Sequence, residues 1–437
     1  MLDLKALDLA HIWHPCTQMK DHETLPIIPI KSAKGIYLYD FEGKAFIDGI
    51  SSWWVNLFGH CNPFINAAIT KQLQQLEHII LAGFSHEGII RYSERLCALL
   101  PQSLQKCFYA DNGSSAIEVA LKMSFHSHYN AGNKDKNAFL SLSNAYHGET
   151  LGALSVGDVA LYKSTYQPLL LECLSAPVPR GIWNPDDGTI SGDYHMELEA
   201  LEEILKHHAH RICAFILEPL LQCAGGMNMY PAAYIKEACA LARKHNIHII
   251  FDEIAVGFGR TGSMFALEQC DVTPDFLCLS KGITGGYLPL SVVVTSNNIY
   301  EGFYAPYEEQ KAFLHSHSYT GNALAIAAAN AVLDIFEQDD IIFSNHSLSV
   351  AIAKRWSMLA KHKKVGNLRV CGMVFAFDLQ GCKLKRAGLY VYENALAKGV
   401  LLRPLGNTIY FMPPYVINLE IAEYVCNVLD AILEDDF

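Results

Sequence analysis

Short apolar runs alternate with helical patterns from about residue 60 to residue 330, and this alternation constrains the fold more than any other feature. Runs such as Cys213–Leu217 and Phe276–Leu279 are apolar throughout, and each ends at a polar residue. Strands of a parallel sheet have this composition because helices cover both faces of the sheet. The sequence therefore predicts an α/β fold in which a mostly parallel sheet lies between helices.

The same pattern predicts the individual elements. The expected strands are Cys107–Ala110, Phe139–Leu142, Cys213–Leu217, Ile247–Phe251, Phe276–Leu279 and Leu290–Thr295. Helical spacing of apolar residues predicts helices over Asn66–Glu77, Ile89–Leu100, Ser114–His126 and Tyr234–His245. Each strand is short, as expected for a sheet whose strands are linked by helices.

The chain is expected to divide into three sections. Residues 1–58 form an N-terminal arm and a segment of a small domain, and residues 59–330 form the large domain. Residues 331–437 form a smaller α/β domain with strands Val374–Asp378 and Thr408–Met412. A long helix through Leu324–Gln338 joins the two domains.

Composition excludes several classes of protein. The net charge is −12 over 437 residues, whereas nonspecific nucleic-acid binding needs a basic surface, so we expect no nucleic-acid partner. No run of about 20 apolar residues could span a bilayer, and the acidic N-terminal stretch does not read as a signal peptide. The 13 cysteines include no C-x-x-C pair, which favours reduced thiols in a cytoplasmic protein.

The stretch IIFDEIAVGFGRTG at 249–262 is compatible with three classes of protein. A P-loop NTPase would need G-x-x-x-x-G-K-[ST], but the only Gly-Lys pair, Gly43-Lys44, is followed by Ala45. A dinucleotide-binding enzyme needs a crossover helix after G-x-G-x-x-G, and only eleven residues separate Gly262 from Pro274. The remaining class is a pyridoxal-phosphate enzyme, which can hold the ring nitrogen of its cofactor with an acid at a strand end.

A metal site is not expected. Neither H-E-x-x-H nor paired cysteines occur, and zinc sites need such clusters. The histidines of KHHAHR at 206–211 lie on different faces of a helix, so this run is interpreted as a solvated helix end.

Four groups of residues at predicted strand ends favour the pyridoxal-phosphate interpretation. DNGSS at 111–115 opens a helix, where Gly113 allows close approach and Ser114 offers a hydroxyl to a phosphate. Asp252 points away from Glu253, because neighbours in a strand face opposite sides, and a buried carboxylate needs a partner. The amine of Lys281, in LSKGITGG, can form a Schiff base once it is desolvated. Tyr146 could stack on a flat ring.

The chain resembles the class III (ω-) aminotransferases of the fold-type-I pyridoxal-phosphate enzymes. The motifs IIFDEIAVGFGRTG, LSKGITGG and HSYTGN carry this resemblance, which covers nearly the whole chain. HIWHPCTQM, SSWW, EPLLQCAGGM and LLRPLGNTIYFMPPY narrow it to members that act in biotin synthesis. These members convert 8-amino-7-oxononanoate to 7,8-diaminononanoate with S-adenosyl-L-methionine as amino donor.

The resemblance implies a role for each cofactor residue. Lys281 binds pyridoxal 5'-phosphate covalently and then shuttles protons, and Asp252 pairs with the ring nitrogen. The remaining roles are phosphate binding by Gly113 and Ser114, stacking by Tyr146 and an acid near the ring at Glu218. Ser318 would reach the phosphate in the neighbouring subunit, which implies a homodimer with active sites at the subunit interface.

The resemblance also implies a substrate pocket. Arg403 binds the substrate carboxylate. The other expected substrate residues are Trp53, Trp54, Tyr410 and Arg260, and Trp53 is favoured over Trp54. Cys16 stands where these enzymes usually have a tyrosine, so we expect a donor pocket that differs from theirs. Two alternatives stay open: a class III enzyme acting on ornithine, 4-aminobutyrate or a similar amine, and a nicotinamide-dependent oxidoreductase using GFGRTG.

Overall fold

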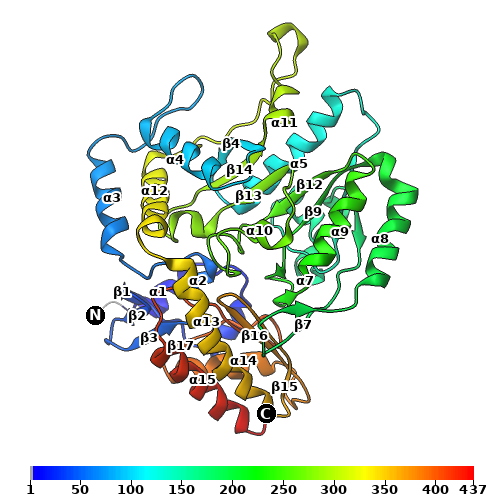
Figure 1. The fold of residues 1–437 in the computed structure, drawn as a ribbon. Coiled ribbons are helices and arrows are strands. Elements are labelled where there is room, and N and C mark those ends of the chain that lie inside the picture. Colours follow the sequence, from blue (N-terminus) through cyan, green and yellow to red (C-terminus); the bar gives the residue numbers. More distant parts are fainter. Residues whose placement is uncertain (1–2) are drawn as a thin grey trace.

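A seven-stranded sheet forms the centre of the large domain (Figure 1), and the computed structural model describes residues 3–437 of the chain. Its strands are, in spatial order, β4 (Leu104–Ala110), β14 (Ser291–Ser296), β13 (Phe276–Leu279), β12 (His248–Asp252), β9 (Ile212–Leu217), β5 (Ala138–Leu142) and β6 (Cys173–Ala176). β14 runs antiparallel to both of its neighbours, and the strands from β13 to β6 are parallel to one another. The predicted mostly parallel sheet is confirmed, with one antiparallel strand within it.

Strands β9 and β13 are apolar throughout because both faces of the sheet are covered. Along β12, Ile249 and Phe251 belong to one core cluster, whereas Ile250 belongs to the other. Both clusters continue into β13, where Leu277 and Cys278 again belong to different clusters. Alternating residues of one strand therefore anchor the two layers of helices.

The helices of the large domain pack on this sheet and on one another. α5 contacts β14, β13 and β9, α9 contacts β12, and α12 packs against α3 and α4. These helices span α5 (Gly113–Asn130), α9 (Ala232–Arg243), α12 (Ala323–Gln338), α3 (Pro63–Leu73) and α4 (Glu87–Ala98). The other helices of this region are α6 (Leu151–Val156), α7 (Ala160–Lys163), α8 (His195–His208), α10 (Ala266–Cys270) and α11 (Asn297–Glu301).

The C-terminal section forms a second, smaller α/β unit. It has an antiparallel sheet in the order β15 (Val365–Cys371), β16 (Val374–Leu379) and β18 (Thr408–Phe411). Its helices are α13 (Ile341–Ser357), α14 (Ala387–Ala397) and α15 (Leu419–Glu434), and α15 packs against the other two. Large aromatic side chains fill this core; Trp356, for example, stacks on Phe411 with ring centroids 6.2 Å apart.

The N-terminal arm joins this smaller unit through a sheet of its own. The arm begins with α1 (Leu4–His11), and its sheet has the order β1 (Ile30–Lys34), β2 (Tyr37–Asp40), β3 (Ala45–Asp48) and β17 (Val400–Leu401). β17 pairs in parallel with β3, so the N-terminal arm and the C-terminal section of the chain meet there. Directly after β3, the turn α2 (Ser51–Trp54) leads back toward the large domain.

Short elements complete the fold. Two small hairpins pair β7 (Ile182–Trp183) with β8 (Ile190–Ser191) and β10 (Leu221–Gln222) with β11 (Asn228–Met229). The 3-10 turns are η1 (Met19–Glu23), η2 (Ser164–Leu169), η3 (Ala209–Arg211), η4 (Lys281–Thr284), η5 (Tyr307–Glu309) and η6 (Met358–Lys361). No helix within residues 3–437 is long and apolar enough to cross a membrane.

The predicted elements are present, with shifted ends. The helix expected over Asn66–Glu77 begins instead at Pro63, because the Asn62 side chain accepts hydrogen bonds from the amides of Phe64 (3.0 Å) and Ile65 (3.3 Å) and caps the helix there. KHHAHR ends α8 and forms η3, as expected of a solvated helix end. In the part of the chain that the structure describes, no group of three or more His, Cys, Asp or Glu residues could hold a metal ion.

Candidate active site

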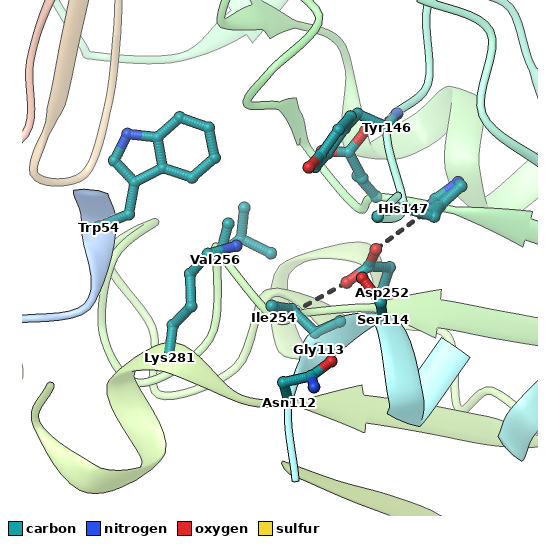
Figure 2. A pocket seen from close by; sticks show the side chains of 13 residues that line it. Trp54, Asn112, Gly113, Ser114, Tyr146, His147, Asp252, Ile254, Val256 and Lys281 are labelled. Atoms are coloured by element: carbon teal, nitrogen blue, oxygen red, sulfur yellow. Dashed lines mark hydrogen bonds and ion pairs between the residues drawn. The ribbon is translucent and has the colours of Figure 1, made fainter. Parts of the chain in front are cut away.

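The carboxyl ends of the parallel strands open into a cavity of about 220 Å³ (Figure 2). Most of the predicted cofactor residues line it, and they come from five strand ends. They are Gly113 and Ser114 after β4, Tyr146 after β5, Glu218 after β9, Asp252 at the end of β12 and Lys281 after β13. Residues far apart in the sequence thus meet where parallel sheets bind their ligands.

Lys281 opens the turn η4 directly after β13 and lies half-buried in the cavity wall. Its backbone adopts a left-handed conformation, with φ 47°, and its Nζ atom lies 5.1 Å from the centre of the Trp54 ring. Desolvation lowers the pKa of the Lys281 amine, although the nearby Asp252 opposes this shift. A lowered pKa increases the fraction of the Lys281 amine that is neutral and therefore nucleophilic.

Asp252 ends β12 and is held by two hydrogen bonds. Its Oδ2 atom lies 2.8 Å from Nδ1 of the buried His147, and its Oδ1 atom accepts a bond of 3.1 Å from the amide of Ile254. Glu253 faces the opposite side of the strand and accepts bonds from the amides of Ala266 (2.6 Å) and Leu267 (2.7 Å). Only the first of the two adjacent acids therefore reaches the cavity, as strand geometry predicts.

The first turn of α5 forms a cradle suited to an anion. Asn112 caps the helix by accepting a bond of 3.1 Å from the amide of Ser115, so the amides of Gly113 and Ser114 stay without an intrahelical partner. Gly148 covers this turn with φ +128°, and a Cβ atom there would lie 2.2 Å from the Ser114 hydroxyl. A side chain at Gly148 would fill the cradle, whose amides and helix dipole favour a phosphate.

Glu218 lies at the back of the cavity and is buried. Its carboxylate accepts bonds of 3.0 Å from the amides of Tyr146 and Cys223. Burial raises the pKa of Glu218 to about 7, and the nearby Asp252 adds to this rise. The bond from the Tyr146 amide also fixes the backbone that carries the Tyr146 ring.

The two adjacent tryptophans differ in their position relative to the cavity. Trp54 lines it, and its Nε1 donates a bond of 3.1 Å to the Tyr410 hydroxyl. Trp53 is 40% exposed and faces Arg403 instead, whose Cζ atom lies 5.4 Å from the indole centre. The sequence put Trp53 first, but only Trp54 contacts the cavity that holds Lys281.

Cys16 lies between Arg403 and the cofactor cavity. Arg403 donates from Nη2 to the Cys16 carbonyl at 2.8 Å, while the Cys16 thiol lies 3.8 Å from Oε1 of Glu149. The same Glu149 oxygen accepts a bond of 3.1 Å from the Tyr146 hydroxyl. Burial and the Glu149 carboxylate raise the pKa of the Cys16 thiol, so this group is a neutral thiol rather than a thiolate nucleophile.

Comparison with known proteins agrees with this geometry. The family model "Aminotransferase class-III" matches residues 17–433. The chain is a class III aminotransferase.

Individual relatives of this aminotransferase carry a more specific name than the family model. An adenosylmethionine-8-amino-7-oxononanoate aminotransferase of Helicobacter pylori is 58% identical over 96% of the chain and 94% of its own length. The relative of that name from Geobacter sulfurreducens is 39% identical over 98% of the chain and 96% of its own length. The family resemblance seen in the sequence motifs is confirmed.

Solved structures agree on the fold of the aminotransferase. A crystal structure of the enzyme of that name from Methanocaldococcus jannaschii has a TM-score of 0.91 and 34% identity, with 99% of this chain and 98% of that chain covered. A thermostable omega transaminase from Pseudomonas jessenii has a TM-score of 0.92 and 26% identity, with 100% of this chain and 99% of that chain covered. The fold-type-I α/β architecture is thereby confirmed.

Six predicted site residues of the aminotransferase do not line the cavity: Cys16, Trp53, Arg260, Ser318, Arg403 and Tyr410. Arg260 is 1% exposed, and its guanidinium donates to the carbonyls of Pro413 (2.7 Å) and Asn56 (3.0 Å); its contact with substrate stays a prediction. These bonds tie the GFGRTG loop to two other segments of the chain. Ser318 is exposed and far in sequence from the elements that line this cavity, so its predicted role toward a neighbouring subunit stays a prediction.

Several residues of the site had no role in the sequence analysis. His147, Asn112, Gly148 and Ile254 all line the cavity, and Glu149 bonds to Tyr146. The motif AYHGE contains His147 and Glu149 together with Tyr146, and this proximity in the sequence was the one signal for their role. The partner of His147 is Asp252, which lies on a distant segment, so this pairing could not be read from the sequence.

Proposed function

We propose that this class III aminotransferase aminates 8-amino-7-oxononanoate to 7,8-diaminononanoate in biotin synthesis, with pyridoxal 5'-phosphate as cofactor and S-adenosyl-L-methionine as amino donor. The convergence of Lys281, Asp252 and the first turn of α5 on one cavity carries the proposal. Relatives with this printed activity match nearly the full chain, at 58% and 39% identity.

The residues present fit the cofactor. The half-buried Lys281 amine would bind its aldehyde carbon, Asp252 its ring nitrogen, and the amides and hydroxyl at Gly113 and Ser114 its phosphate. Gly148 leaves room for the phosphate, since a Cβ atom there would lie 2.2 Å from the Ser114 hydroxyl. When bound, pyridoxal 5'-phosphate supplies an electron sink for the negative charge that develops at the reacting carbon.

The residues of the chain perform the proton chemistry around that group. Lys281, whose pKa is lowered by desolvation, can take a proton from the reacting carbon and return it to a neighbouring atom. Asp252, held by His147 and the Ile254 amide, keeps a proton on the ring nitrogen through its negative charge. The buried walls around Ile254 and Val256 exclude water from this step.

The substrate side suits an apolar chain that ends in a carboxylate. Trp54 and Tyr410 provide apolar surface beside Lys281, and Arg403 lies farther out, across Trp53. A planar guanidinium binds a carboxylate through two parallel hydrogen bonds. 8-Amino-7-oxononanoate would place its ketone at Lys281 and its carboxylate at Arg403.

The donor would use the surface around Cys16. S-adenosylmethionine carries a sulfonium cation, and the Glu149 carboxylate lies beside the rings of Tyr146 and Tyr162, whose centroids are 5.5 Å apart. Carboxylates and aromatic faces both attract such a cation. Cys16 is smaller than the tyrosine that is usual at this position, so the donor gains room and loses a phenol.

We propose further that the active unit is a homodimer in the cytoplasm. Ser318 lies exposed in the segment HSHSYTGN, where it could reach a cofactor phosphate bound by the partner subunit. All 13 cysteines are free, in keeping with a reducing compartment. Mixing Ser318→Asp subunits with Lys281→Ala subunits should give one intact site per mixed dimer and recover activity that neither variant has. No recovery would exclude shared sites.

The alternative is another class III ω-aminotransferase, acting on ornithine, 4-aminobutyrate or a similar amine. The omega transaminase match at a TM-score of 0.92 favours it. Incubating the enzyme with 8-amino-7-oxononanoate and each donor separately, and detecting 7,8-diaminononanoate by mass spectrometry, decides between them. Product with S-adenosylmethionine supports the proposal. Turnover of simple ω-amines without any amination of this ketone would contradict it.

A further inference from the structure

The two tryptophans of the substrate side are carried by a left-handed turn. Four consecutive residues without a glycine have positive φ angles: Ser51 (52°), Ser52 (46°), Trp53 (73°) and Trp54 (73°). Side chains at such angles clash with the backbone, and each residue costs free energy. A turn of this kind persists only where its surroundings hold it in place.

Asp48, the last residue of β3, holds this turn. Its Oδ1 atom accepts bonds from the amides of Ile50 (3.3 Å) and Ser52 (2.9 Å), and its Oδ2 atom accepts a bond from the Ser52 hydroxyl (2.7 Å). Oδ2 also lies 2.9 Å from Nε2 of His60. One fully buried carboxylate thus binds the start and the middle of the strained turn.

His60 keeps this carboxylate charged and oriented. The Asn56 side-chain amide lies 3.2 Å from Nδ1 of His60, so Nδ1 accepts and Nε2 carries the proton donated to Asp48. Burial alone raises the pKa of Asp48, but bonds from His60 and Ser52 outweigh it, and the pKa lies below its usual value.

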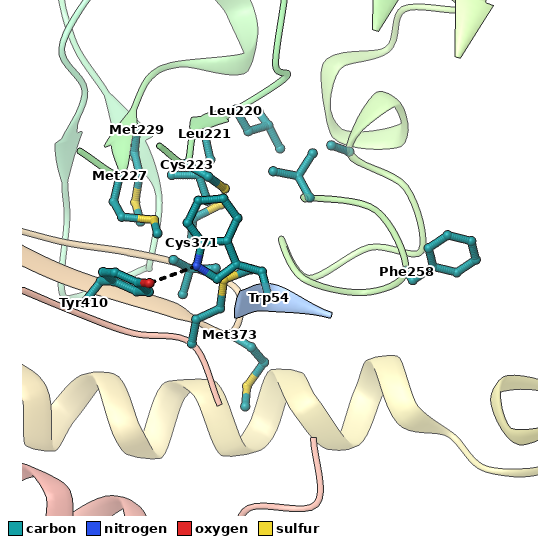
Figure 3. Close-up of a cluster of buried hydrophobic side chains, with 14 of the residues drawn as sticks. Trp54, Leu220, Leu221, Cys223, Met227, Met229, Phe258, Cys371, Met373 and Tyr410 are labelled. Carbon is teal, nitrogen blue, oxygen red and sulfur yellow. Dashed lines mark hydrogen bonds between the residues drawn. The ribbon is translucent and has the colours of Figure 1, made fainter. Parts of the chain in front are cut away.

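The first and last residues of the turn are fixed by the smaller unit. The Ser51 hydroxyl donates 2.8 Å to the Met412 carbonyl, and Trp54 bonds to Tyr410. Figure 3 shows the Trp54 indole seated among Cys223, Met227 and other apolar side chains, with its nitrogen toward Tyr410. These contacts set the depth of Trp54, while Asp48 sets the conformation of the residues that precede it.

We infer that Asp48 is a positioning residue for substrate binding, which holds the left-handed turn so that Trp54 faces Lys281 and Trp53 faces Arg403. Asp48 is fully buried and does not line the cavity, so it acts through the two indoles. The inference rests on the proposed function in one respect, namely that these indoles bound the substrate pocket.

The first test follows the turn directly in the holoenzyme. The chain has five tryptophans, so 5-fluorotryptophan labelling gives five fluorine resonances, and those of Trp53 and Trp54 are assigned with single Phe variants. Asp48→Asn keeps the side-chain volume but turns an amide donor toward the donors Ser52 or His60. The Trp53 and Trp54 resonances should shift or broaden, while that of Trp183, in β7, stays in place.

The second test measures catalysis. Asp48→Asn should raise KM for 8-amino-7-oxononanoate about tenfold, with kcat changed less than about threefold and the visible absorbance of the bound cofactor unchanged. Ser52→Ala, which removes one of the four contacts, should give a smaller rise. Asp275→Asn is the matched control, since Asp275 also accepts a backbone amide (Ile249, 2.7 Å) but does not touch the turn.

Two results would overturn the inference. One is unchanged Trp53 and Trp54 resonances together with an unchanged KM. The other is an equal loss of kcat, cofactor absorbance and melting temperature, which would make Asp48 a general structural residue. If the wild type fails to aminate this ketone, the proposed function fails, and the fluorine resonances still decide whether Asp48 holds the turn.

Discussion

The Nδ1 atom of His147 lies 2.8 Å from Oδ2 of Asp252, and both side chains are buried at the edge of the sheet. This pair joins the end of β12 to the segment after β5, and it aims the carboxylate into the cavity beside Lys281. The sequence analysis assigned a role to Asp252 but none to its partner.

Replacing His147 by Ala should lower kcat by roughly 10- to 100-fold, because a charged hydrogen bond contributes roughly 1.5–3 kcal/mol. Without this bond, the Asp252 carboxylate would no longer be held in its orientation toward the cavity. Steady-state kinetics and absorbance titration with pyridoxal 5'-phosphate check this. His128→Ala is the control, since His128 is equally buried but bonds to the Cys213 carbonyl (3.0 Å). An equal loss in both variants would contradict the assignment.

Lys281→Ala should abolish turnover while the enzyme still binds the cofactor non-covalently through the α5 cradle and Asp252. In the wild type, borohydride reduction followed by peptide mapping should place the label on Lys281. A label on another lysine would refute the whole site.

Arg403→Ala should lower kcat/KM for the acceptor on the order of 10²-fold, because the acceptor carboxylate loses the guanidinium that would bind it through two hydrogen bonds. Its melting temperature and cofactor spectrum should not change, since the Arg403 guanidinium donates only to the Cys16 carbonyl and the Thr17 hydroxyl within residues 3–437. The methyl ester of the acceptor should be a poor substrate for the wild type but lose little further on the variant. Normal acceptor binding with a lowered melting temperature would make Arg403 structural.

Cys16→Tyr should change donor KM or donor preference, with acceptor KM nearly constant. The reason is that a tyrosine would fill the space beside Glu149 and Tyr146 and restore a phenol there. Kinetics with S-adenosylmethionine and with simple amines check this. Equal effects on donor and acceptor, or none, would show that Cys16 only packs.

Glu218 should make stability depend on pH. Its pKa is about 7 in the folded protein against 4.5 ordinarily, so between these values the unfolded chain releases a proton that the folded one retains. The contribution of Glu218 to the free energy of unfolding therefore falls by about 3 kcal/mol as the pH rises through that window, and it stays constant at higher pH. The melting temperature of the wild type should fall relative to that of Glu218→Gln between pH 5 and pH 8. A constant difference would contradict the shift.

The sequence by itself determined the α/β class and the strand ends that carry the cofactor residues. Apolar runs such as Phe276–Leu279 can only be buried between two layers of helices, and parallel strands bring their carboxyl ends to one edge. The alternation of a strand likewise decides that Asp252, and not Glu253, faces the cavity. These are local rules, so they can be applied without knowing distant contacts.

Only the tertiary structure decided which side chains meet. Arg260 is held by the carbonyls of Asn56 and Pro413, which lie far away in the sequence, and it does not line the cavity that holds Lys281. Trp53 and Trp54 are neighbours with the same side chain, yet a left-handed turn held by Asp48 sends one to Arg403 and the other to Lys281. The reason is physical: burial and a strained backbone are maintained by long-range hydrogen bonds, and no local pattern of residues encodes the partners of those bonds.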